Sequence, residues 1–128
     1  MTMTAPLIAR LVAAGRIGFG VALVVAPERV TSLWLGNDAG RPGARVVTRG
    51  LGARDLGLGV GALAAADSGL QPWVAAAIVA DTADLVATVA AGKSLPLTGR
   101  ALVGAVAAGG AILGAIAFAG LRRGASRA

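Results

Sequence analysis

The chain has 128 residues, of which 56% are hydrophobic and only 14% are charged. Soluble helices need a polar face and soluble domains carry about 25% charged residues, so this composition excludes an ordinary soluble helical domain. The sequence has no cysteine and no histidine, which excludes disulfides and thiolate nucleophiles and removes the commonest metal ligand. The net charge of +6 comes from scattered basic residues and a tail containing Arg122, Arg123 and Arg127. That distribution favours anionic lipid over nucleic acid as a partner.

Four apolar segments follow one another along the chain, each close to the roughly 20 residues that a membrane-spanning helix needs. The first covers residues 6–26, between a proline that suits a helix start and another that marks a break. Residues 27–36 are too short to span, and their apolar side chains recur at helical spacing. We therefore expect a short amphipathic helix there, in the membrane interface. The other spans are expected at residues 45–67, 72–91 and 97–121.

The predicted fold is all-α: an integral membrane four-helix bundle with a short interfacial helix between spans 1 and 2. It forms a single transmembrane domain over residues 1–128 and lies in the cell membrane as a multi-pass protein. Gly110 and Gly114 form a GxxxG pattern, which lets helix backbones approach closely. Trp34 and Trp73 are expected at opposite membrane interfaces, where tryptophan is enriched. A second copy of the chain is a further candidate partner, because four spans alone make a thin wall for a channel.

Charged residues inside the predicted spans carry most of the functional information. Three arginines and three aspartates among them are the candidates, and a charged side chain at the bilayer centre costs roughly 2.5–3.5 kcal/mol on insertion scales. The equal numbers of the two signs predict mutual neutralisation in the interior of the bundle. These residues are Arg16, Arg49, Arg54, Asp55, Asp81 and Asp84.

Helical spacing directs several of these charges into the bundle. Arg16 shares a helix face with small residues of the first span, and Asp55 shares one with small residues of the second. Asp81 and Asp84 are three residues apart, on one face of the third span. Because small residues in membrane helices usually face another helix, we expect these four side chains to point inward.

The inward charges predict a polar pocket near the middle of the membrane. Asp81 and Asp84 are the candidate catalytic acid and base, with Asp55 as a third carboxylate, because one buried carboxylate can hold a proton while an arginine keeps its neighbour ionised. Arg49 and Arg54 lie about half a turn apart, so we do not expect them to share a partner. Arginine can also bind the polar groups of a ligand. The candidate ligand-binding residues are Arg16, Arg49 and Arg54. The alternative is that the charges only hold the helices together as buried ion pairs.

Several segments carry a resemblance to a known group of proteins. They are ARLVAAGRIGFG at residues 9–20, PERVTSLWLG at residues 27–36, RGLGARDLGLG at residues 49–59, and the Asp81 and Asp84 pair. With these segments the chain resembles small four-span bacterial membrane proteins classed only as domains of unknown function. The resemblance covers most of the chain and implies a four-helix fold whose charges form one site. It implies no particular activity.

Three classes of function remain open from the sequence. The first is a membrane protein that binds or converts an amphiphilic small molecule by acid–base chemistry, of the isomerase or cyclase type, without a cofactor or a metal ion. The second is a small proton-coupled transporter or channel. The third is a structural membrane subunit without chemistry. An enzyme needs one entrance to the site, whereas a transporter must open it to each side of the membrane in turn.

Overall fold

Five helices make up most of the part of the chain that the computed structural model describes, residues 4–126, and no strand occurs within that part. The helices are α1 (Thr4–Val25), α2 (Pro27–Leu35), α3 (Pro42–Ala64), α4 (Leu70–Ala91) and α5 (Leu97–Ala125). Short 3-10 turns join them: η1 (Gly36–Gly40), η2 (Asp67–Gly69) and η3 (Gly92–Ser94). The predicted all-α class is confirmed, and a short helix follows the first long one as expected.

Prolines and glycines determine where several helices begin and end. Pro27 and Pro42 lie in the first turns of α2 and α3, where a missing backbone N–H removes no helical hydrogen bond. Gly36 and Gly92 follow α2 and α4 with φ angles of 59° and 53°, which glycine adopts at little cost. These residues convert one apolar sequence into separate helices joined by short turns.

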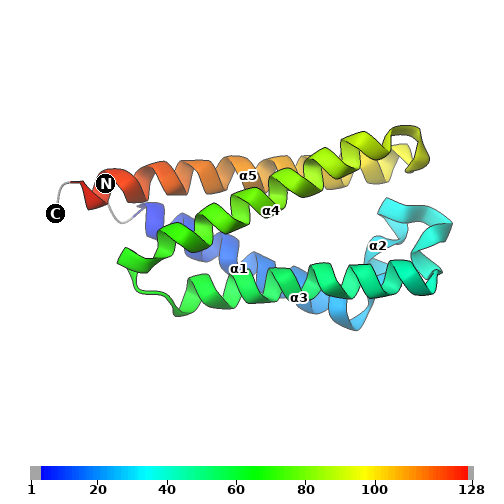
Figure 1. Cartoon of the computed structure of the whole chain (residues 1–128), viewed down its shortest axis with the longest axis horizontal. Coiled ribbons are helices and arrows are strands. Elements are labelled where there is room, and N and C mark those ends of the chain that lie inside the picture. The colour runs from blue at the N-terminus through cyan, green and yellow to red at the C-terminus, as the bar shows by residue number, and fades with distance from the viewer. Residues whose placement is uncertain (1–3, 127–128) are drawn as a thin grey trace.

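The long helices form two close pairs. Figure 1 shows them running alongside one another, with α2 at one end of the bundle. α1 packs along α3, α4 packs along α5, and α1 also contacts α5, whereas α3 and α4 make few contacts with each other. In Figure 1, α4 slants away from α3, from the η2 turn toward the end that holds α2. Most of the packing between the two pairs therefore comes from the contact of α1 with α5.

Small residues allow the close approach of α1 and α3. A Cβ atom added at Gly52 would lie 2.7 Å from the carbonyl oxygen of Gly20, and one added at Gly59 would lie 2.6 Å from that of Ala13. Buried alanines, with Leu70 and Val74, continue this packing toward the η2 end as an apolar core. The prediction that small-residue faces point into the bundle is confirmed.

Two arginines cap the helices of the first pair reciprocally. Arg10 on α1 donates hydrogen bonds to the carbonyl oxygens of Leu63 (3.1 Å) and Ala65 (3.0 Å), at the end of α3. Arg49 on α3 donates from Nε to the carbonyl oxygen of Val24 (3.2 Å), near the end of α1. The last carbonyl groups of a helix lack backbone partners and attract cations. Each helix of the pair therefore caps the C-terminal end of the other.

Among residues 4–126, three helical segments are long and apolar enough to cross a membrane: Thr4–Val25, Asp67–Ser94, which contains α4, and Leu97–Ala125. The predicted span at residues 45–67 forms α3, a helix of 23 residues, but it is not among these three. Its four charged residues, which include Arg45 and Arg49, lower its hydropathy. Many large apolar side chains are exposed along the bundle, which is unusual for a protein that faces water.

Of the predicted basic tail, Arg122 and Arg123 lie in the last turn of α5, and Arg127 lies outside the described residues.

Candidate functional site

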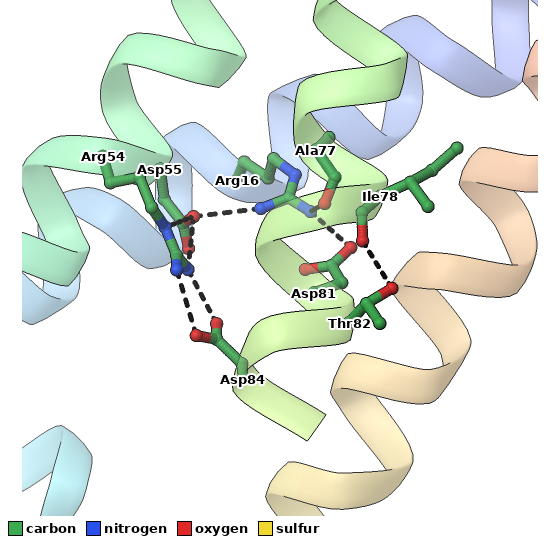
Figure 2. Close-up of polar contacts among 8 residues, drawn as sticks. All are labelled: Arg16, Arg54, Asp55, Ala77, Ile78, Asp81, Thr82 and Asp84. Atoms are coloured by element: carbon green, nitrogen blue, oxygen red, sulfur yellow. Dashed lines mark hydrogen bonds and ion pairs between the residues drawn. The ribbon is translucent and has the colours of Figure 1, made fainter. Parts of the chain in front are cut away.

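Arg16 links three helices at the centre of the bundle. From α1, its Nη1 donates to Asp55 Oδ1 on α3 at 2.9 Å, and its Nη2 forms a short ion pair with Asp81 Oδ2 on α4 (Figure 2). Nη2 also donates to the carbonyl oxygen of Ala77 at 3.3 Å. Only 10% of the Arg16 side chain is exposed. This buried guanidinium therefore fixes the relative positions of α1, α3 and α4.

Arg54 makes the second connection, between α3 and α4. Its Nη1 and Nη2 donate to Asp84 Oδ1 at 3.0 Å and Oδ2 at 2.7 Å, which is the fork-to-fork geometry that arginine forms with a carboxylate. The same guanidinium reaches Asp55 Oδ1, at 3.3 Å from Nε and 3.2 Å from Nη2. Figure 2 shows Arg54 between these two carboxylates. The ion pair joins two helices that otherwise make few contacts.

The two connections form one continuous network. In order it runs through Asp84, Arg54, Asp55, Arg16 and Asp81. Three carboxylates therefore face two guanidinium groups, and no other lysine or arginine among residues 4–126 forms an ion pair with them. If every group is ionised, the network carries one unit of excess negative charge. Such an excess is costly in an apolar environment unless a proton or a cation balances it.

Glycines make the space for these charges. Gly52 and Gly59 flank Asp55 on its helix face and bring α1 close enough for Arg16 to reach it. On α5, Gly110 lies against Asp81: an added Cβ would lie 2.9 Å from Asp81 Cγ and closer still to Oδ2. Gly114, one turn further, lies against Ile78. The GxxxG pattern thus packs against side chains of α4, and Gly110 also makes room for a carboxylate.

A cleft of about 350 Å³ opens beside the network. Its polar side consists of Arg16, Asp55, Asp81 and Asp84. Its apolar walls come from α1, α2 and α5 and include Phe19, Val30, Trp34, Leu102 and Val106. Sites for small molecules are typically about 300–1,000 Å³, mostly apolar, with a few convergent polar groups. The cleft has this character.

Two buried hydrogen-bond donors of cleft-lining residues have no partner within the described part of the chain. They are the indole Nε1 of Trp34 and the Nε of Arg16. On the acceptor side, Asp81 uses Oδ2 for Arg16, and its Oδ1 accepts no hydrogen bond from residues 4–126. Buried polar groups in proteins are nearly always satisfied by protein, water or ligand. Residues 4–126 thus leave polar atoms of three cleft-lining residues without a partner, and both donor nitrogens are themselves enclosed.

The structure brings together five of the six predicted site residues and leaves out Arg49. Arg49 lies at the end of α1, where it contacts Val24 and lines a separate surface hollow. Arg49 therefore does not join the other predicted charges in one site. It lies about half a turn from Arg54 around α3, so the two side chains point in different directions, as expected. Trp34, which was expected at a membrane interface and was not among the predicted site residues, forms part of the cleft wall. The signal in the sequence was the apolar face of the short helix that carries Trp34. Such a face can pack against other helices of the protein as well as against lipid.

Comparisons of the chain with protein-family models, with curated protein sequences and with solved structures gave no match. The resemblance to four-span proteins of unknown function therefore stays a prediction. What can be said of function rests on the network and its cleft.

Proposed function

We propose that the protein crosses the cell membrane with α1, α3, α4 and α5 and binds an amphiphilic small molecule in the cleft beside the Arg–Asp network. One observation carries the proposal: three carboxylates, with only two arginines to balance them, form the polar side of an otherwise apolar cleft. Apolar walls suit the hydrocarbon part of such a ligand. The carboxylates suit a polar headgroup that is cationic or donates hydrogen bonds.

The packing of α3 supports its crossing of the membrane despite its charges. α3 lies along α1, with close approaches at Gly20–Gly52 and Ala13–Gly59, so the two helices share the same depth. Arg54 and Asp55 point into the network, and the remaining charges of α3 lie in its first eight residues. Charges that face the interior of a bundle or lie near a membrane boundary are compatible with insertion. In this arrangement α2 lies at the boundary, as expected for an interfacial helix.

The network is also suited to acid–base chemistry on the ligand. A protonated Asp81 or Asp84 can donate a proton to one atom of the ligand while a neighbouring carboxylate removes a proton from another atom. Such a pair of transfers rearranges the ligand without net gain or loss of protons, which is the balance of an isomerase or cyclase reaction. Arg16 and Arg54 then keep the remaining carboxylates ionised and oriented. This chemistry needs no cofactor.

Fluorescence of Trp34 provides a direct test of binding. The chain has two tryptophans and no tyrosine, so Trp73→Phe leaves Trp34, on the cleft wall, as the single strong fluorophore. The protein is placed in phosphatidylcholine nanodiscs and titrated with a long-chain amine that carries bromine near its head. A brominated alcohol of equal chain length serves as the neutral probe. We expect the amine to quench Trp34 at lower concentration than the alcohol does.

Charge variants separate occupation of the cleft from quenching by probe dissolved in the bilayer. Asp84→Asn should weaken quenching by the amine several-fold, because the cleft loses its excess negative charge. The matched control, Asp67→Asn, removes a carboxylate on the exposed η2 turn, away from the cleft, and should leave quenching unchanged. Equal quenching in all three proteins would reject binding at the carboxylates.

The unequal number of charges favours a second candidate, a small proton-coupled transporter. One proton on a carboxylate would balance the network, and its loss and return could be coupled to transport. Proteoliposomes with a pH-sensitive dye inside test this candidate. If the protein is a transporter, addition of the amine to one side should change the internal pH. The Asp84→Asn variant should not produce this change. A protein that only binds its ligand should quench Trp34 without a pH change.

A further inference from the structure

A second charged region lies away from the network, where α1 ends and α3 begins. Arg29, Arg45 and Arg49 line an open hollow of about 680 Å³ between α2 and the end of α1, together with Glu28. Arg45 forms an ion pair with Glu28, so two positive charges remain without a balancing carboxylate in the hollow. We propose that this hollow binds the phosphate of an anionic phospholipid headgroup. The site rests on insertion of α1 and α3 into the bilayer, but not on any ligand in the cleft.

The arginines have donors available for a phosphate. Arg49 uses its Nε for the carbonyl oxygen of Val24, which positions the guanidinium and leaves both Nη groups without a partner among residues 4–126. The Arg29 side chain donates to no group within the same residues, and Arg45 uses only Nη2. Arginine matches phosphate oxygens with its planar pair of N–H groups. Three such groups around one hollow provide charge and directed hydrogen bonds.

The surface next to these arginines suits the acyl chains of the same lipid. Val25, 74% exposed, belongs to the hollow itself. Along the outer face of α3, Val46, Ala53 and Val60 are exposed and recur every seven residues, on the side of the helix that carries Arg49. An apolar stripe therefore runs from the arginines toward the middle of the bilayer. This continuity favours a lipid over free phosphate, since free phosphate makes no use of the stripe.

The test is the retention of lipid by the purified full-length protein in native mass spectrometry. Phosphatidylglycerol and phosphatidylcholine of equal chain length are compared, with inorganic phosphate as the third probe. We expect one phosphatidylglycerol molecule to be retained in preference to phosphatidylcholine. The variant R29Q/R45Q/R49Q should retain it at least about tenfold more weakly, because each basic residue near a membrane surface contributes measurably to binding of anionic lipid.

A matched control removes the same charge from the same end of the bundle. R41Q/K93Q/R100Q changes three basic residues that do not line the hollow and should alter retention by no more than about twofold, because a phosphate held there receives its directed hydrogen bonds from the lining arginines. The double variant R29Q/R45Q spares the contact of Arg49 with Val24 and should still weaken retention if the triple variant fails to fold. Equal losses in the two triple variants would reject the site. Displacement of the lipid by inorganic phosphate at equal concentration would show that the hollow recognises free phosphate instead.

Discussion

Arg54 on α3 and Asp84 on α4 form a two-pronged ion pair, with Nη1–Oδ1 at 3.0 Å and Nη2–Oδ2 at 2.7 Å. The helices that carry them make few other contacts, so this pair closes the bundle on the side where packing is weakest. Side chains that hold two elements together in this way differ from surface ion pairs, because removing one partner leaves the other charge in an apolar environment.

Replacement of Arg54 tests how far the ion pair stabilises the bundle. Arg54→Gln leaves three carboxylates facing Arg16 alone, and we expect a loss of about 3–5 kcal/mol in the free energy of unfolding. The surface variant Arg41→Gln, whose partner Asp38 is exposed, should cost no more than about 1 kcal/mol. Denaturant titration in detergent micelles, followed by circular dichroism, measures both. Similar small losses in the two variants would show that the ion pair of Arg54 and Asp84 does not stabilise the bundle.

The three aspartates should differ in their contributions to stability. Asp55 accepts hydrogen bonds from both arginines, so Asp55→Asn weakens the two central connections of the network and should cost about 3–5 kcal/mol. Asp81 lies at one end of the network, and Asp81→Asn leaves two carboxylates facing two arginines. We expect Asp81→Asn to cost no more than about 1 kcal/mol, because the lost ion pair is offset by the removal of excess charge. Unfolding free energies measured side by side would contradict this account if Asp81→Asn were the more costly.

Two neighbouring glycines on α5 test the space beside Asp81. Gly110→Ala places a methyl group against the Asp81 carboxylate, so we expect a loss of about 1–3 kcal/mol in the free energy of unfolding, as for other overpacked sites. Gly109→Ala meets nothing within 4 Å and should be neutral or stabilising by up to about 1 kcal/mol, because alanine is the better helix former. Both variants gain the same helix propensity, so the difference between their unfolding free energies reports the effect of the contact with Asp81 alone. If both variants are equally stable, α4 and α5 do not pack as described.

Asp84→Glu separates a ligand-binding role from a purely structural one. The longer carboxylate keeps its charge and can still pair with Arg54, so a structural subunit should tolerate it with a loss of less than about 1.5 kcal/mol. Asp84 also lines the cleft, where its side chain is 26% exposed. In the Trp73→Phe background we therefore expect weaker quenching by the brominated amine even though stability is kept. Unchanged quenching together with unchanged stability would favour the structural subunit.

The sequence by itself determined the helices and the faces they bury. Apolar length, together with Pro27 and Pro42, defines where the chain can be helical, because these effects are local. The stripes of small residues that contain Arg16 and Asp55 identified the buried faces, since a charge in an apolar helix is expected to point toward a neighbouring helix. The charges of α3 also reduced its hydropathy, so the number of spans could not be read from composition alone.

Only the tertiary structure decided which charges meet. Helical spacing shows that Arg49 and Arg54 diverge, but the partners of each depend on how α1 and α4 are placed around α3. The structure puts Arg49 at the end of α1 and puts Arg54 in the network. It also places Gly110 against Asp81 and Trp34 on the wall of the cleft. A cleft is the space that several packed helices leave between them, so the periodicity of one helix cannot reveal it.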